Sequence, residues 1–183
     1  MEKGKIIYLN GVSSSGKSTL AKTLQERLTE PYYWINVDTF CYMMPEKHYV
    51  NYTGPVWKRI SSGMHNTIRL FSDMGMNVIA DDVFESYEAM EECVGTLHEY
   101  PVLFVHVTCP PEELRRRERE RGDRGIGQAE DQLPRLSPQD NVYDITVDTF
   151  NGSKEDCADR IIKMMDYPEK FKAFETLWSR RSN

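Results

Sequence analysis

Apolar residues along the chain follow two patterns, short continuous runs and longer segments in which they recur at helical spacing. Several runs are apolar at consecutive positions, which is typical of strands buried on both faces of a parallel sheet. The runs alternate with the helical segments, as in repeated strand-helix units. The predicted strands are 6–9, 32–37, 76–80, 101–107 and 143–147, and the predicted helices begin at Lys17 and Pro111 and cover 55–74, 86–97, 154–165 and 169–180.

This alternation predicts an α/β fold with a five-stranded parallel sheet and helices on both faces. The 183 residues suit one domain, so we expect a single domain over 1–183. Two stretches interrupt the regular pattern. The first is an insertion at about 40–75, and the second is a polar segment at about 117–138.

A glycine-rich motif, G-x-x-x-x-G-K-S, lies between the first predicted strand and the first predicted helix. This is the setting of a P-loop, whose backbone N–H groups and following helix N-terminus bind nucleotide phosphates. The motif therefore predicts binding of a nucleoside triphosphate with Mg²⁺. The residues expected to hold the nucleotide are Gly11, Ser13, Ser14, Ser15, Gly16, Lys17, Ser18 and Thr19, with Ser18 also at the metal.

Ligands of parallel sheets bind beyond the carboxyl ends of the strands, where this chain carries several acidic residues. Asp38 follows the second predicted strand, and a carboxylate there can accept a proton from a hydroxyl that attacks the γ-phosphate. Asp38 can equally cap the next helix. Position alone leaves the two interpretations open.

Asp81 and Asp82 follow the third predicted strand, in the manner of a Walker B carboxylate. We place Asp81 at the metal and Asp82 near the acceptor, although the reverse assignment stays open. Neighbouring residues of a strand point to opposite faces, so a turn or capping role is expected for at least one of them.

The segment 115–124 is the densest positive patch of the chain. Arg117, Arg121 and Arg124 recur at i, i+4 and i+7, so they share one helix face. Such a run is usually a solvated face of ion pairs. Its place before a glycine-rich loop favours a lid over 117–138, in which Arg117 binds the nucleotide and Arg121 and Arg124 stabilise the transferring phosphoryl group.

The insertion contains aromatic residues and methionines that can form an apolar pocket for an acceptor. We expect Phe40 and Met44 to contact the acceptor. The alternative role of these side chains is to pack the insertion onto the sheet, and we expect that role for most of them.

Composition narrows the possible partners. The net charge of −6 gives no overall attraction to nucleic acid or to anionic membranes, and no stretch is long enough to span a bilayer. The four cysteines are far apart, so neither a zinc site nor a disulfide framework is expected, and a reducing, cytoplasmic setting fits best. The oligomeric state cannot be predicted from the sequence.

Five motifs, in chain order between about Ile6 and Ile162, resemble chloramphenicol phosphotransferase and its relatives. They are G-x-S-S-x-G-K-S at Gly11 to Ser18, V-D-T-F at Val37 to Phe40 with Met44-Pro45 after it, D-D-V-F at Asp81 to Phe84, R-E-R-x-R-G-D-R at Arg117 to Arg124, and Y-D-x-x-V-D-T at Tyr143 to Thr149.

The resemblance implies an adenylate-kinase-like P-loop fold and ATP-dependent phosphorylation of a hydroxyl on a small molecule. It also implies that Asp38 is the general base and that Arg121 and Arg124 belong to the lid. The segment 45–56 and the tail 167–183 depart from the pattern, so the acceptor stays open. The alternatives are a nucleotide or metabolite kinase of the same fold and a nucleotide-dependent switch that is not a kinase.

Overall fold

The computed structural model describes residues 2–48, 54–84, 86–121, 127–136 and 142–181. Its strands are β1 (Ile6–Asn10), β2 (Tyr32–Asn36), β3 (Asn77–Asp82), β4 (Val102–Thr108) and β5 (Ile145–Asp148). Its α-helices are α1 (Lys17–Arg27), α2 (Val37–Cys41), α3 (Gly54–Asp73), α4 (Tyr87–Leu97), α5 (Pro111–Arg121), α6 (Gln128–Gln132), α7 (Lys154–Met165) and α8 (Ala173–Arg180), and short 3-10 helices cover Glu46–His48, Leu133–Arg135 and Pro168–Lys170.

The five strands form one parallel sheet in the order β2-β3-β1-β4-β5. Strand β1 lies in the middle, between β3 and β4, so the chain winds outward from it in both directions. Such a switch point leaves a crevice at the carboxyl ends of the strands. Here the P-loop leaves β1, and Asn10 at the end of β1 is level with Asp82 at the end of β3.

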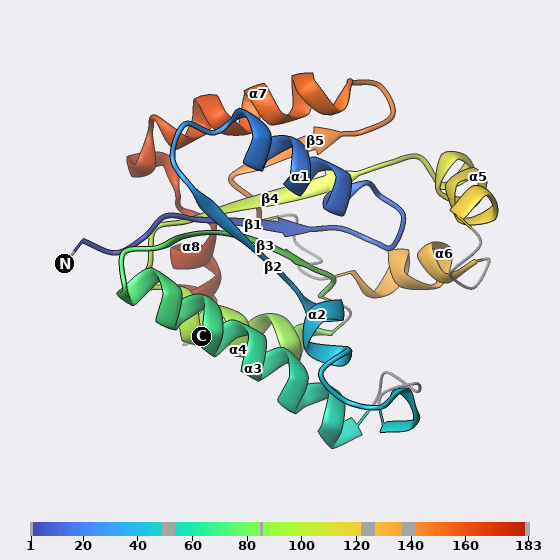
Figure 1. Ribbon diagram of the computed structural model, residues 1–183, viewed down its shortest axis with the longest axis horizontal. Helices are drawn as coiled ribbons and strands as arrows, with labels where there is room; N and C mark the ends of the chain where they lie inside the picture. Colours follow the sequence, from blue (N-terminus) through green and yellow to red (C-terminus); the bar gives the residue numbers. More distant parts are fainter. Residues whose placement is uncertain (1, 49–53, 85, 122–126, 137–141, 182–183) are drawn as a thin grey trace.

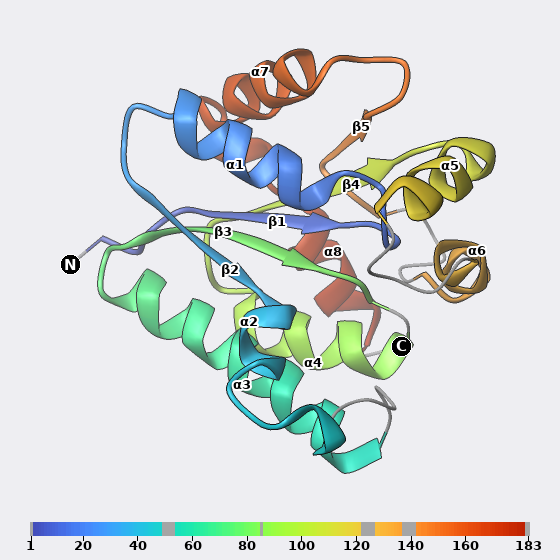
Figure 2. The ribbon, with the colours of Figure 1, turned by 45° about the vertical axis from the view of Figure 1, so that its right-hand side comes forward.

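Helices cover both faces of the sheet (Figures 1 and 2). Helices α1 and α7 pack on one face around Leu24 and Ile161, and α3, α4 and α8 pack on the other around Ile68 and Phe174. Both faces are therefore removed from water, which explains why the central strands are apolar at consecutive positions. The predicted α/β fold with five parallel strands is confirmed.

Helices α5 and α6 lie apart from these layers, beyond the carboxyl ends of the strands (Figure 1). A small apolar cluster joins them to the P-loop, with Val12 from the loop, Leu114 from α5 and Ala129 from α6. The polar segment after the arginine run was expected to be a loop and instead contains α6. Because the buried carboxylate of Glu118 accepts hydrogen bonds at the start of α6, a short polar helix is stable there.

Several predicted boundaries differ from the observed ones. Strand β2 ends at Asn36, whose side chain accepts a hydrogen bond from the N–H of Thr39 and so starts α2 one residue later. Strand β3 continues through Asp82. The last predicted helix is divided, because Asp144 accepts hydrogen bonds from the N–H groups of Lys172 and Ala173 and starts α8 there.

Within the described residues, no helix has the length and apolar character that crossing a bilayer requires.

Candidate active site

The P-loop has a backbone that only its glycines permit. Gly16 has φ 97°, and a Cβ atom there would lie 3.3 Å from the side chain of Thr149. A Cβ atom at Gly11 would lie 2.4 Å from the carbonyl oxygen of Val107, which no real contact allows. Gly16 is therefore required for its backbone conformation and for space, and Gly11 is required for the close approach of the Val107 backbone.

Protein donors bind the carbonyl groups of the loop. Lys17 Nζ donates to the carbonyls of Gly11 and Val12 at 2.8 and 3.1 Å. Thr149 Oγ1 donates to the carbonyl of Ser15 at 2.7 Å. Because a trans peptide places N–H opposite to C=O, the Gly16 N–H points away from Thr149.

A cavity of about 480 Å³ opens in front of the P-loop. It brings together the predicted phosphate-binding residues and the acidic and basic side chains that follow the strands. The predicted site residues that line it are Ser13, Ser14, Gly16, Lys17, Ser18, Thr19, Asp38, Asp81, Asp82, Arg117 and Arg121.

Three serine hydroxyls of the loop lack a partner in the protein, and two of them belong to residues that line the cavity. The hydroxyl oxygens of Ser13, Ser14 and Ser15 are buried and have no hydrogen-bond partner. Buried polar atoms in native proteins almost always have a partner, so Ser13 and Ser14 in the cavity wall are suited to a ligand rich in oxygen, such as a nucleotide phosphate.

The end of β3 places one carboxylate against the P-loop. Ser18 Oγ donates to Asp81 Oδ2 at 2.8 Å, and Lys17 Nζ lies 3.8 Å from Asp81 Oδ1. Burial raises the pKa of Asp81, while the Lys17 charge and the Ser18 hydrogen bond act in the opposite direction. The described residues contain no cluster of three or more acidic, histidine or cysteine ligands. A hydroxyl and a carboxylate suit Mg²⁺, which takes its remaining ligands from phosphates and water.

Asp82 points to the opposite face of the sheet, as predicted for adjacent strand residues. Its Oδ1 accepts from the N–H of Val83 at 2.7 Å, which is the turn role expected for one of the two. Its Oδ2 accepts from the hydroxyl of Tyr8 at 3.1 Å. Asp82 therefore lines the cavity while the Val83 N–H and the buried Tyr8 hydroxyl engage its two carboxylate oxygens.

His65 from α3 belongs to the same network and was not among the predicted site residues. The side chain is 0% exposed, with Nε2 3.1 Å from the Tyr8 hydroxyl and Nδ1 hydrogen-bonded to Glu92 of α4. Burial alone lowers the pKa of His65, but Cys93, Asp82 and Glu92 outweigh it and raise that pKa well above its usual value. The only signal in the sequence was a histidine beside the apolar face of a predicted helix, since its partners come from other elements.

Asp38 occupies the second position of α2, not the end of β2, and its half-buried side chain lines the cavity. The capping interpretation was wrong, because Asn36 performs that function. Helix α2 follows β2 at once, so a residue in its first turn lies at the same sheet edge as the P-loop.

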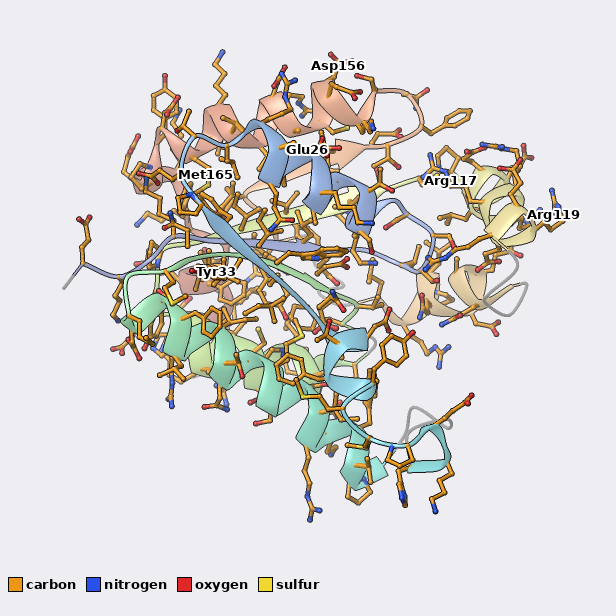
Figure 3. The ribbon with its side chains drawn as sticks, in the orientation of Figure 1. Glu26, Tyr33, Arg117, Arg119, Asp156 and Met165 are labelled. Atoms are coloured by element: carbon orange, nitrogen blue, oxygen red, sulfur yellow. The ribbon has the colours of Figure 1, made fainter. Side chains whose placement is uncertain are left out.

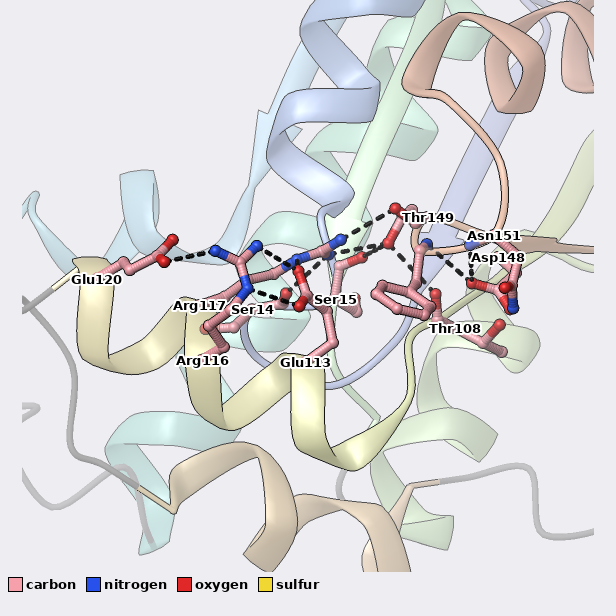
Figure 4. A network of polar contacts seen from close by, with 11 residues as sticks. Ser14, Ser15, Thr108, Glu113, Arg116, Arg117, Glu120, Asp148, Thr149 and Asn151 are labelled. Carbon is pink, nitrogen blue, oxygen red and sulfur yellow. Dashed lines mark hydrogen bonds and ion pairs between the residues drawn. The ribbon is translucent and has the colours of Figure 1, made fainter.

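The arginines of α5 divide between its two sides. Arg117 lies on the side that faces the P-loop, whereas Arg119 points outward (Figure 3). Arg117 donates to Thr149 Oγ1 and to the Thr149 carbonyl, both at 2.9 Å, and to Ser14 O at 3.4 Å (Figure 4). The contact of Arg117 with the nucleotide stays a prediction. The structure shows in addition that Arg117 binds the backbone of the P-loop at Ser14.

Two further arginines of the run have different surroundings. Arg121 ends α5 and lines the cavity, whereas Arg116 pairs with Glu113 and Glu120 (Figure 4). Arg124, the other predicted lid residue, lies outside the described residues.

A second cavity, of about 390 Å³, lies between α2 and α3. It contains both insertion residues that were expected to contact an acceptor, and its wall is mainly apolar. The lining residues are Phe40, Met43, Met44, His48, Val56, Arg59 and Ile60.

The model of the chloramphenicol phosphotransferase-like protein family matches residues 4–166 of the chain. Two relatives from Mycobacterium tuberculosis, in strains CDC 1551 and H37Rv, are each 31% identical over 173 residues, covering 81% of this chain and 76% of the relative. Both names describe a provisional O-phosphotransferase.

Solved structures share the fold at low identity. The Mycobacterium tuberculosis APS kinase CysC, in complex with AMPPNP and APS, has a TM-score of 0.69 at 17% identity, covering 91% of this chain and 99% of that one. Shikimate kinase from Acinetobacter baumannii, in complex with shikimate, has a TM-score of 0.63 at 18% identity, covering 90% and 94%. The architecture is therefore that of P-loop kinases.

Proposed function

The chain belongs to the chloramphenicol phosphotransferase-like family, and on that premise we propose that it is an ATP-dependent kinase for a hydroxyl group of a small molecule. The observation that carries this proposal is the shared cavity, in which the carboxylate of Asp38 and the P-loop with Lys17 line one space. A P-loop alone binds phosphates. A carboxylate in the same cavity can in addition take a proton from an attacking hydroxyl.

The proposed reaction is an in-line transfer. The acceptor oxygen bonds to the γ-phosphorus, the bond to the β–γ bridging oxygen breaks, and the acceptor proton passes to the Asp38 carboxylate. ADP and the phosphorylated acceptor are the products. Arg121, which ends α5 and lines the cavity, can supply positive charge that stabilises the transferring phosphoryl group.

Ser18 and Asp81 are the residues that would hold Mg²⁺, on the basis of their mutual hydrogen bond beside Lys17. The ion would supply neutralisation of phosphate charge when bound. The buried, unpartnered hydroxyls of Ser13 and Ser14 support a nucleotide polyphosphate at the loop.

The acceptor is proposed to extend into the second cavity. Phe40 and Met44 line it, and α2 carries both Phe40 and Asp38, so one short helix connects the reacting group with the apolar wall. Such a wall favours an acceptor with an apolar body over a polyhydroxylated one. Chloramphenicol, the acceptor in the family name, is the first candidate.

The test is ADP release by the purified protein with ATP and Mg²⁺, against a panel of hydroxylated molecules that includes chloramphenicol, a sugar and shikimate. Stimulation by an acceptor with an apolar body, together with a phosphorylated product in mass spectrometry, supports the proposal. Stimulation only by a sugar or shikimate would identify a metabolite kinase of the same fold. Nucleotide binding with no stimulated release by any acceptor would instead favour a nucleotide-dependent switch.

A further inference from the structure

A glutamine from the segment after the arginine run contacts the P-loop directly. Gln132, the last residue of α6, accepts a hydrogen bond at its Oε1 from the backbone N–H of Ser13 at 2.7 Å. The side chain is 4% exposed, so this bond is shielded from water. Ser13 and Gln132 are 119 residues apart in the sequence, and neither residue type is needed for the P-loop pattern.

The loop needs such external support at this point. Ser14 has φ 60°, a left-handed conformation that L-residues other than glycine rarely adopt. Arg117 and Thr149 hold the carbonyls of Ser14 and Ser15 on one side (Figure 4). Gln132 holds the N–H of Ser13, one residue before the left-handed position. The turn is therefore fixed from both sides.

Gln132 is itself held in place. The carboxylate of Glu118, a fully buried residue of α5, accepts from the N–H groups of Gly127 and Ala129, both at 2.8 Å. Ala129 also packs with Val12 of the loop and Leu114 of α5 in a small apolar cluster. Glu118, α6 and Gln132 thus form a continuous chain of contacts from α5 to the P-loop.

We propose that Gln132 is a positioning residue for the nucleotide, which presets the P-loop through Ser13 and couples α5 and α6 to it. The inference rests on the proposed nucleotide site and adds a residue outside the P-loop motif to it. Coupling of this kind is reciprocal, so a bound nucleotide would also stabilise the docked position of α6.

The alternative is that Gln132 only packs α6 against the body of the protein. Substitution to leucine distinguishes positioning of the P-loop from packing of α6, because Gln132→Leu retains most of the side-chain volume and removes the oxygen that accepts the hydrogen bond from Ser13. Gln128→Leu is the matched control, since Gln128 is the other glutamine of α6 and the Ser13 N–H donates to Gln132. Two measurements are needed for each variant. The first is the Kd of the ATP analogue AMPPNP in the presence of Mg²⁺. The second is the hydrogen exchange rate of the Ser13 amide, measured by NMR without nucleotide.

Gln132→Leu is expected to weaken AMPPNP binding about fivefold, as for the loss of one net hydrogen bond, and to speed exchange at Ser13. Gln128→Leu should change neither. Gln132→Glu, which keeps an oxygen acceptor of the same reach, should restore slow exchange at Ser13.

Unchanged AMPPNP affinity in Gln132→Leu, at a temperature where the variant is folded, would overturn the inference. So would equal weakening by the two leucine variants. If the unmodified protein does not bind AMPPNP at all, the proposed nucleotide site fails. The exchange rate at Ser13 then still decides whether Gln132 holds the loop.

Discussion

His65 Nε2 lies 3.5 Å from Asp82 Oδ2, which joins a buried imidazole of α3 to a carboxylate at the wall of the proposed active site. Both side chains are nearly inaccessible, and Tyr8 and Glu92 contact the same imidazole. Buried charges are stable only when partners compensate them. The position of Asp82 in the site is therefore fixed from the core.

Replacing His65 should destabilise the fold. His65→Gln leaves the buried Asp82 carboxylate without its cationic partner, and we expect the free energy of unfolding at neutral pH to fall by about 3 kcal/mol. The pKa of His65 is raised in the folded state, so its contribution is fully present below the unfolded pKa and is lost as the pH rises through the folded value. Urea unfolding across a series of pH values measures both effects.

His48→Gln is the control for this prediction, because His48 is an exposed histidine. It should leave the free energy of unfolding nearly unchanged at every pH. A loss in His65→Gln no larger than in His48→Gln would show that the buried network is energetically neutral.

Asp38→Asn should abolish phosphoryl transfer and leave nucleotide binding nearly intact. The amide keeps the shape of the side chain but cannot accept the proton, and a general base typically contributes about 100-fold or more to the rate. ADP release with an active acceptor gives kcat, and titration with AMPPNP gives the Kd. Full kinase activity in the variant would reject Asp38 as the base.

Arg117→Ala should weaken nucleotide binding about tenfold, because it releases Thr149 and the carbonyl of Ser14 at once. Arg117→Lys should recover only part of this, since an ammonium group cannot reproduce the planar, multiple contacts of a guanidinium. The control is Arg119→Ala, which removes an arginine from the outer side of the same helix (Figure 3). Equal effects of the two alanine variants would point to net charge rather than to loop geometry.

Acid should remove the contribution of Glu113 to the free energy of unfolding. Hydrogen bonds from Arg116 and Arg117 lower the pKa of Glu113 from 4.5 to about 2. A lowered carboxyl pKa stabilises the folded state above the unfolded pKa, and the effect is lost as the pH falls toward the folded value. Glu113→Gln should therefore be less stable than the unmodified protein at pH 7, by a margin that narrows between about pH 4.5 and 2.

Glu112→Gln serves as the comparison, because the neighbouring Glu112 is exposed on the same helix. Chemical denaturation at several pH values measures the difference in the free energy of unfolding between each variant and the unmodified protein. A margin for Glu113→Gln that stays constant with pH would show that its pKa is not lowered by the arginines.

The parts of the site that the sequence predicted are those whose signals are contiguous. The P-loop from Gly11 to Ser18 can be identified because strand, glycines, lysine and helix follow one another within a few residues. The sheet and its covering helices could be predicted because apolar periodicity is a local property of each segment. Residues at strand ends were expected to meet at one edge, and the structure places Asp38, Asp81 and Asp82 along one cavity.

Tertiary structure alone decided which side chains support these residues. His65 meets Tyr8 across 57 positions, Arg117 meets Thr149 across 32, and Gln132 meets Ser13 across 119. Each contact depends on how two distant elements pack, and a hydrogen bond between such elements leaves no periodic or composition signal in either. The sequence thus determined the fold and the P-loop, whereas the packing of α3 on one face of the sheet and of α5 and α6 beyond its carboxyl ends determined what holds that loop and Asp82 in place.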